Sequence, residues 1–192
     1  DVRLGIRPDQ PDVLPMAEHR VYGEPASTLG GRWTAGASAL ALHRDSGGQD
    51  MQRASADIGW QRRDVLPVGL VTQLDLAARG DFYALQDRDA AALNPGMDPD
   101  SNRGRGMAVA GVTASYPLVK RLPKSQMVIE PIVGASISPQ VDDNDRGIPN
   151  EDSVDIQLDT SNLFAQNRFT GIDGQEDGAR VNYGLRSGVY GD

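Results

Sequence analysis

The sequence predicts an all-β protein: an antiparallel segment of a transmembrane β-barrel, about seven strands of a larger barrel, with short periplasmic turns and long extracellular loops. Three observations lead to this prediction. Apolar and polar residues alternate over stretches of roughly nine to eleven residues, the length of a tilted membrane-crossing strand. The connections, counted from Asp45, run moderate, short, long, short and long, an asymmetry typical of outer-membrane barrels. Eight of the ten aromatic residues lie near expected strand ends, where barrels carry aromatic girdles. They are Tyr22, Trp33, Trp60, Phe82, Tyr83, Tyr116, Tyr183 and Tyr190.

In the first half of the chain, weakly patterned strands are expected over 13–23 and 33–44, with a Pro/Gly-containing turn between them. The alternation becomes clear in the strand expected over 52–63, where the even positions Ala54, Ala56, Ile58 and Trp60 are all apolar. A tight turn is expected at 63–65. In the following strand, which begins at Leu66, one parity is apolar and the other polar. The apolar positions are Leu66, Val68, Leu70, Leu74 and Leu76, and the polar ones are Gln73, Asp75 and Arg79. A helix over 71–78 is a weaker alternative, because the strict alternation is long.

In the second half, a long loop is expected over 86–105, which is rich in Pro and Gly, followed by a strand over 107–118 and a charged turn over 119–125. The strand expected over 126–138 carries its apolar residues at odd positions. A second long loop, 139–179, separates it from a last strand in which Val181, Tyr183, Leu185 and Val189 alternate with polar residues. The pattern therefore predicts one domain over 1–192, interrupted by two long loops.

Composition excludes several classes of protein. The net charge of −8 argues against nucleic-acid binding, which needs a basic face. The longest uncharged run, Val65 to Leu74, is too short for a membrane-spanning helix, which needs about 18 to 20 apolar residues. Because the chain contains no Cys, it can form neither disulfides nor thiolate metal sites. We expect it to be an excerpt of a longer mature protein, since it starts at Asp1 without Met or a signal peptide.

The loop over 139–179 is expected to be ordered, because Leu163, Phe164, Phe169 and Ile172 interrupt its polar residues. Its sequence, with the strands on either side, resembles the C-terminal barrel domain of the LptD family of outer-membrane lipopolysaccharide-assembly proteins. The residues that carry the resemblance in the loop are Asn150, Glu151, Asp152, Asp159, Asn162, Leu163, Phe164, Asn167, Arg168, Phe169, Gly171, Asp173, Asp177, Gly178 and Arg180. Gly174 departs from the family pattern, which has a basic residue after the Asp.

The resemblance implies a large barrel in the outer membrane of a Gram-negative bacterium, surrounded by outer-membrane lipid. Such a barrel closes around an LptE-like lipoprotein plug, receives lipopolysaccharide from a periplasmic bridge protein through regions outside this chain, and releases it into the outer leaflet. The resemblance also implies that the matching loop folds toward the lumen near the plug. No cofactor, metal or catalytic residue is implied.

One parity of the strands predicts a set of lumen-facing side chains. They are Arg53, Asp57, Asp75, Arg79, Asn182 and Arg186, accompanied by Gln61, Gln73 and Arg180. A water-filled interior is enough to explain them. The sharper hypothesis is that the Arg side chains guide phosphorylated sugar head groups, since guanidinium pairs well with phosphate.

Other site hypotheses are weaker. His43 with Asp45 or Asp50 at the rim would suit an outer-membrane enzyme, yet a His at a wet strand end is the simpler interpretation. The acidic segment 142–147 hints at calcium, but Arg146 stands where an oxygen ligand is needed. A glycine-flanked arginine at 104–106 is interpreted as a turn, and Gly184 as a lumen position that other backbone approaches closely. A porin-like channel, a rim-active outer-membrane enzyme and a soluble β binding module remain alternatives to lipopolysaccharide transport.

Overall fold

The computed structural model describes residues 12–25, 29–44, 49–86, 98, 100–139, 147–153, 162–169, 171–174 and 176–191. Within them, eight strands form one antiparallel sheet in the order β1-β2-β3-β4-β5-β7-β6, with β8 pairing with β7. The strands are β1 (Asp12–Tyr22), β2 (Arg32–His43), β3 (Asp50–Val65), β4 (Val71–Gln86), β5 (Ser101–Ser115), β6 (Leu118–Leu122), β7 (Ser125–Ser138) and β8 (Gly178–Gly191). The prediction of an all-β antiparallel fold is confirmed, with eight strands in the described part instead of about seven. The sheet is open there.

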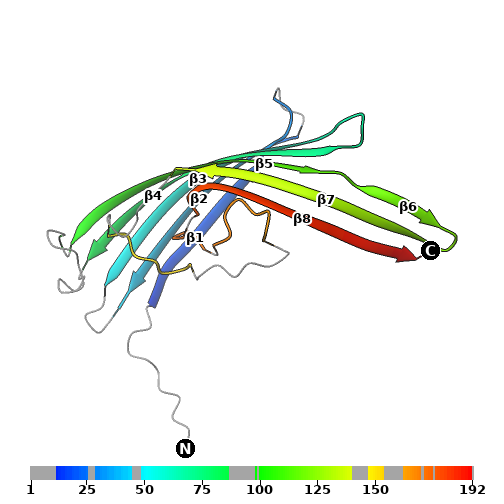
Figure 1. Cartoon of the computed structure of the whole chain (residues 1–192). Helices are drawn as coiled ribbons and strands as arrows, with labels where there is room; N and C mark the ends of the chain where they lie inside the picture. Colours follow the sequence, from blue (N-terminus) through cyan, green and yellow to red (C-terminus); the bar gives the residue numbers. More distant parts are fainter. Residues whose placement is uncertain are drawn as a thin grey trace, which may run out of the picture.

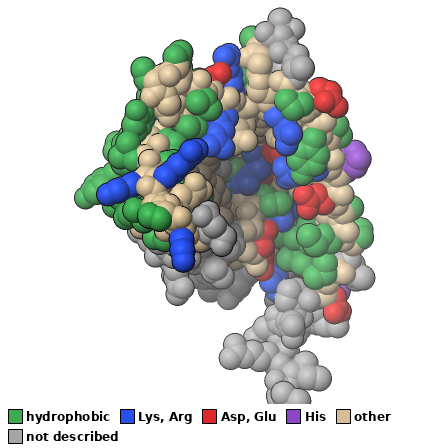
Figure 2. Space-filling view, turned by 90° about the vertical axis from the view of Figure 1, so that its right-hand side faces the viewer, with side chains coloured by type: hydrophobic (Ala, Val, Ile, Leu, Met, Phe, Trp, Pro, Cys, Tyr) green, Lys and Arg blue, Asp and Glu red, His purple; other side chains and the backbone are tan. Residues whose placement is uncertain are grey.

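The sheet is a curved arch with two contrasting faces (Figure 1). Large apolar side chains project from the outer face, such as Ile58, Leu76 and Val181, which are 49%, 51% and 71% exposed. The inner face carries polar and charged side chains, and described parts of the chain between β7 and β8 lie beneath the arch. Figure 2 shows basic and acidic side chains inside the resulting hollow. This division follows from the alternation in the sequence, because successive strand residues point to opposite faces.

The turn expected at 63–65 is wrong by several residues. β3 continues to Val65, β4 begins at Val71, and the chain reverses over 66–70. Gly69 donates its N–H to the carbonyl of Leu66 at 2.8 Å and has φ = 86°, so the β-turn is closed by a glycine in the left-handed region. Leu66 and Val68 belong to this turn, but they are apolar and happen to continue the apolar parity of the next strand. For this reason the prediction placed the turn too early in the chain.

Two further boundaries need correction. The loop expected over 86–105 ends earlier, because β5 begins at Ser101 and the supposed turn at 104–106 lies within this strand. Gly104 and Gly106 face outward there and Arg105 faces inward. The charged turn expected over 119–125 is mostly strand β6, paired with β7 so that only Pro123 and Lys124 connect them. Glycine and charge suggest turns, but strand pairing overrides both.

The alternation of connection lengths is confirmed by the strand bounds. The described residues contain no helix that is long and apolar enough to cross a membrane.

A small apolar core lies on the inner face, formed by Leu42, Met51, Tyr83 and Leu85 of β2 to β4 with Ile148 from the chain after β7. Tyr83 is fully buried, so its assignment to an outer aromatic girdle is wrong. Trp33 and Trp60 do lie on the outer face as a tilted pair with ring centroids 6.4 Å apart.

Candidate functional site

The inner face of β3, β4 and β5 holds a compact group of polar side chains, which we call the wall cluster: Arg53, Arg79, Asp81, Tyr83 and Arg105. These residues occupy the same face of three neighbouring strands, with Asp81 opposite Arg105 in the register. The Arg105 guanidinium donates to Asp81 Oδ2 from Nε at 3.0 Å and from Nη2 at 2.7 Å, and Nη2 also lies 2.9 Å from the Tyr83 hydroxyl. Arg79 Nε donates to the same carboxylate oxygen at 3.2 Å.

Residues 147–153, 162–169, 171–174 and 176, between β7 and β8, form what we call the docked loop. Its centre is Asp173, whose side chain is fully buried. Asp173 Oδ1 accepts hydrogen bonds from Arg53 Nη1 at 2.6 Å and from the Tyr83 hydroxyl at 2.8 Å. Its Oδ2 accepts from the Glu151 N–H at 2.9 Å, and its carbonyl accepts from Arg105 Nη1 at 2.6 Å. One loop residue therefore contacts β3, β4 and β5 together.

Asp152 holds the turn that presents Asp173. Its Oδ1 accepts the N–H groups of Ile172 and Asp173, both at 2.9 Å, while its Oδ2 accepts from Arg53 Nη1 at 2.9 Å. Burial of this carboxyl opposes its ionisation, but the two amides and the guanidinium together outweigh burial and hold the pKa of Asp152 below its usual range. Gly171 precedes the turn with φ = 76°, and any side chain there would collide with Asp152.

Charge explains why the loop docks at this place. The wall cluster has three guanidinium groups and one carboxylate, and Asp152 and Asp173 bring two more carboxylates. Arg79 and Arg105 additionally donate to the Ile172 carbonyl. Buried charges are stable only when they are paired and hydrogen-bonded, so the loop and the wall satisfy each other.

An apolar contact anchors the loop a second time, on β7 and β8. A side chain at Gly134 would meet the Phe164 ring at 3.1 Å, and one at Gly184 would meet the same ring at 3.3 Å. The two glycines thus form a recess for Phe164 on the inner face. The sequence predicted that another backbone segment would approach Gly184 closely. The groups that do so are the side chains of Phe164 and Leu163.

A third anchor is ionic and lies at the start of β8. Glu176 pairs with both Arg168 and Arg180, and Arg180 Nη2 also donates to the Gln166 carbonyl at 3.1 Å. Burial opposes ionisation of Glu176, but the two arginines outweigh it and lower its pKa. Asn167 binds the loop to itself, since its Nδ2 donates to the Gly174 carbonyl at 3.0 Å and its Oδ1 accepts from the amides of Phe169 and Glu176.

Gly174, the departure from the family pattern, is required by packing. A side chain at this position would lie 2.8 Å from the Phe169 ring and 2.9 Å from Ser153 Cβ. No salt bridge can form from position 174. Arg105 of β5 supplies a guanidinium next to Asp173, at its carbonyl.

At the rim beside β2 and β3, Arg44 pairs with Glu151 of the loop at 2.7 Å. The neighbouring His43 Nδ1 lies 2.8 Å from Asp50 Oδ2, and the other oxygen of Asp50 accepts the Arg44 N–H. The His43–Asp50 pair considered from the sequence therefore exists, but Asp50 is already occupied in holding the strand end. Asp45 lies outside the described residues.

The other residues predicted from the sequence are placed as follows. On the inner face, Asp75 is buried and accepts a hydrogen bond from Gln61, while Asp57 pairs with Arg20. Asn182 is half-buried, and Arg186 is exposed beside Glu130.

In the loop, Asn150 caps a turn by accepting the Ser153 N–H at 2.9 Å. Asn162 begins a turn closed by the Ala165 N–H, Asp177 is exposed, and Gly178 starts β8 with φ = 79°. Asp159 lies outside the described residues, as does most of the acidic segment 142–147. Among all the described residues, no three His, Cys, Asp or Glu side chains gather in a way that could hold a metal ion.

Sequence reasoning missed Asp81, Tyr83 and Arg105 as site residues. Tyr83 was assigned to the girdle and Arg105 to a turn. A usable signal did exist, because residues 79, 81 and 83 continue the polar parity of β4 to the end of that strand.

Among known protein families, a family model described as LptD, LPS transport system D, matches residues 6–192. A comparison with curated proteins found no match to this chain.

Proposed function

Because the chain belongs to the LptD family, we propose that it forms part of the wall of an outer-membrane β-barrel through which lipopolysaccharide moves from the periplasm to the outer leaflet. Proteins of this family are outer-membrane components of Gram-negative bacteria, and membership gives the chain a role in lipopolysaccharide transport and outer-membrane biogenesis. The family is not known for enzymatic activity. The route through the barrel and the contacts along it are our proposal.

The observation that carries the proposal is the contrast between the two faces of the sheet. Most large apolar side chains of the outer face are more than 40% exposed, including Leu74, Val133 and Val181. A contiguous apolar surface of this kind is unfavourable in water and favourable against lipid chains. The alternating inner face carries Arg53, Asp75 and Arg79, which suits a hydrated lumen. We therefore assign the outer face to outer-membrane lipid and the inner face to the lumen.

In this proposal the docked loop lies within the lumen and narrows it. Its wall-facing side is fixed by Asp152, Asp173 and Phe164, as described above. The opposite side is available to a partner, which we propose to be an LptE-like lipoprotein plug. Lipopolysaccharide would reach the barrel from a periplasmic bridge protein that contacts regions outside this chain.

Transport itself is tested by depleting the full-length protein in cells and measuring lipopolysaccharide at the surface. Depletion is expected to reduce newly delivered surface lipopolysaccharide, and re-expression to restore it. Unchanged delivery after depletion would refute the role in transport.

The placement of the two faces is tested by photo-crosslinking in the native membrane. A photoreactive amino acid is placed at loop positions Gln166 and Asp177, and in matched controls at outward positions Val181 and Leu185 of β8. The loop positions are expected to give an adduct with a small lipoprotein, and the outward positions an adduct with lipid. Lipoprotein adducts from β8 but not from the loop would reverse the assignment of the faces.

A further inference from the structure

A positively charged segment lies at the same end of the sheet as the turn over 66–70. We call it the basic hairpin: residues 116–129, which comprise β6, the turn at 123–124 and the start of β7. It contains three basic side chains, Lys120, Arg121 and Lys124, and no acidic one, although the whole chain has a net charge of −8. All three are exposed. Figure 2 faces the end of the molecule where β6 and the end of β8 lie, and basic side chains project there over apolar ones.

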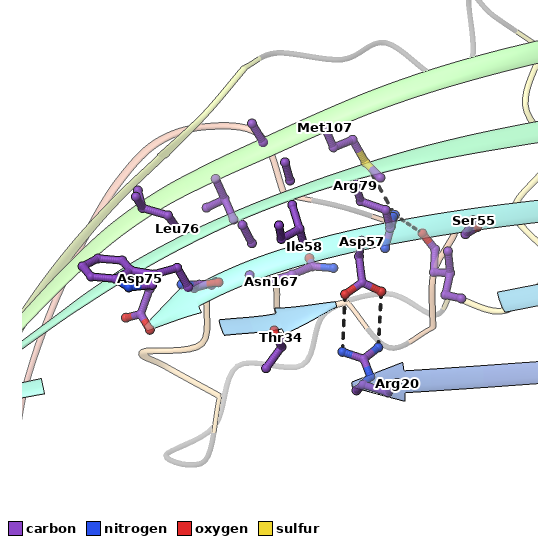
Figure 3. Close-up of a pocket in the computed structure, with 18 of the residues that line it drawn as sticks. Arg20, Thr34, Ser55, Asp57, Ile58, Asp75, Leu76, Arg79, Met107 and Asn167 are labelled. Carbon is purple, nitrogen blue, oxygen red and sulfur yellow. Dashed lines mark hydrogen bonds and ion pairs between the residues drawn. The ribbon is translucent and has the colours of Figure 1, made fainter. Parts of the chain in front are cut away.

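The charges of the basic hairpin are not neutralised within the described part of the chain. On the inner face, by contrast, Arg20 and Asp57 lie 3.4 Å apart at the hollow drawn in Figure 3. Glu130, the acidic residue that follows the basic hairpin in the sequence, pairs with Arg186 of β8. No described carboxylate pairs with the three basic side chains of the hairpin. They are therefore available to a negatively charged partner.

The surface around Lys120 is apolar. Lys120 lies opposite Met127 of β7, which in turn lies opposite Val189 of β8. Residues opposite each other in paired strands point to the same face, and Val189 continues the outward parity of β8, so Lys120 lies on the outer face. Its neighbours on this face, Leu118 and Leu122, are 51% and 42% exposed, and Val189 is 68% exposed. The ammonium group thus stands on an exposed apolar surface.

Tyr116 precedes this group on the same face. Its N–H donates to the carbonyl of Pro131 at 3.1 Å, so β5 and β6 follow each other in one register along β7. The Tyr116 side chain therefore also points outward, and it is 39% exposed. Tyrosine and lysine combine an apolar body with a polar tip, and such side chains gather where the hydrocarbon of a bilayer meets its headgroups. The succession Tyr116, Leu118, Lys120 and Leu122 suits that boundary.

The open edge of β6 is poorly suited to a protein strand. In the described sheet β6 pairs with β7 alone, so its other edge is unpaired. Pro117 and Pro123 stand at its two ends and Lys120 at its centre, and proline and lysine are residues that prevent pairing along an exposed edge. The apolar surface around Lys120 is also continuous with the outer face, which the proposed function assigns to lipid. Charge and surface together favour an anionic lipid over an acidic protein.

We propose that the basic hairpin binds the headgroup phosphates of anionic phospholipids, in the leaflet at the short-turn end of the barrel wall. In outer-membrane barrels the short turns lie on the periplasmic side. Basic side chains near an anionic membrane surface are attracted to it, and the apolar stem of Lys120 can lie along lipid chains while its charge reaches the phosphates. The inference rests on the proposed function, because it needs the outer face to lie in lipid, and it adds a class of lipid held at one defined place.

The test uses the full-length protein in its purified complex, reconstituted into nanodiscs of phosphatidylcholine with a minor fraction of phosphatidylglycerol. A photoreactive amino acid at Leu122 captures neighbouring lipid, and mass spectrometry gives the ratio of the two lipid adducts relative to their ratio in the bilayer. Phosphatidylglycerol is expected to be enriched severalfold at Leu122. It should not be enriched at Val181, an outward position at the opposite end of the sheet. Adducts at Leu122 in the proportions of the bilayer would overturn the proposal.

Variants connect the enrichment to the basic side chains. Replacing Lys120, Arg121 and Lys124 together by Gln is expected to remove it, and each single change should lower it roughly two- to fivefold. Lys120→Arg keeps the charge and should keep the enrichment. The matched control Arg103→Gln removes a positive charge at the opposite end of β5 and should leave the ratio unchanged. Enrichment that survives the triple change would refute the role of the hairpin. If the triple variant does not insert, Lys124→Gln in the exposed turn decides, and a wild-type ratio there would refute the same role.

Two further results would assign the basic hairpin to another partner. If inorganic phosphate lowered the enrichment more than chloride does at the same ionic strength, the hairpin would be a site for soluble anions. If Leu122 gave a protein adduct in the native membrane in place of lipid, the partner would be a protein. Either result would refute the lipid.

Failure of this inference can be separated from failure of the proposed function. Lipid adducts at Val181 and Leu185 without enrichment of phosphatidylglycerol at Leu122 would overturn the basic hairpin as a lipid site and leave the barrel wall standing. Absence of lipid adducts at Val181 and Leu185 would overturn the placement of the outer face itself, and with it the proposed function.

Discussion

Replacing Asp173 by Asn is expected to release the docked loop from the wall while the strands stay folded. The substitution keeps the shape of the side chain but removes the charge that faces Arg53 at 2.6 Å. It also places an amide NH₂ where only donors are present, since Tyr83 and the Glu151 N–H both point at this carboxylate. Removing one partner of a buried ion pair costs about 3–5 kcal/mol. At about 1.36 kcal/mol per factor of ten, the open population of the loop should rise roughly a hundred- to several-thousand-fold.

Hydrogen exchange measured by mass spectrometry on the full-length protein reports this opening. The amides of Glu151, Ile172 and Asp173 all donate within the cluster, so the peptides that contain them should exchange faster by that factor. Asp64→Asn is the control, because Asp64 forms an exposed pair with Arg62 and such pairs contribute at most about 1 kcal/mol. Unchanged exchange in the loop would show that Asp173 does not hold it. Equal loss of protection in β7 and β8 would show that the loop does not open as a separate unit.

Three further predictions concern the same loop. Gly171→Ala should speed hydrogen exchange of the loop at least tenfold, because φ is 76° and the added methyl group would collide with Asp152. The control Gly178→Ala has a similar φ of 79° but open space around the methyl group, so its effect should be smaller. A larger effect at Gly178 would contradict this reasoning. Gly184→Leu should displace the Phe164 ring from the recess formed by Gly134 and Gly184, so a photo-crosslink from position 164 to β7 should be lost. If this crosslink persisted, the ring would not lie in the recess. Because the folded-state pKa of Asp152 is lowered, its contribution is present above the unfolded value near 4 and is lost as the pH falls further. Loop protection, corrected for intrinsic exchange, should therefore be constant from neutral pH to about pH 5 and fall below pH 4, and a loss already at pH 6 would indicate another titrating group.

Local pattern was sufficient to predict the strands and their two faces. Alternation placed Ile58 and Leu76 on one face and Asp57 and Asp75 on the other, because the side-chain period of a strand is fixed by its geometry. The same rule could not locate the turn at 66–70, since the exposed apolar residues of a short turn follow the parity by chance. Strand bounds failed where glycine and charge suggested a turn, as around Arg105.

The apolar residues of the loop predicted that it would be ordered, but they did not show where it would dock. Phe164 and Phe169 predicted that part of the loop is buried, but they did not predict which residues they would contact. Phe164 packs against glycines of β7 and β8, whereas Phe169 packs within the loop against Gly174. That difference depends on the path of the chain, which no local pattern records.

The sequence by itself determined an antiparallel β protein with one apolar and one polar face, interrupted by long loops, because alternation and connection length are properties of neighbouring residues. Only the tertiary structure decided which polar residues form a site. Asp173 meets Arg53 across 120 positions and Tyr83 across 90, and Arg105 joins them from a segment that resembled a turn. Such partners are selected by charge balance in a buried space, and that space exists only once three strands are paired and the loop has folded back onto them.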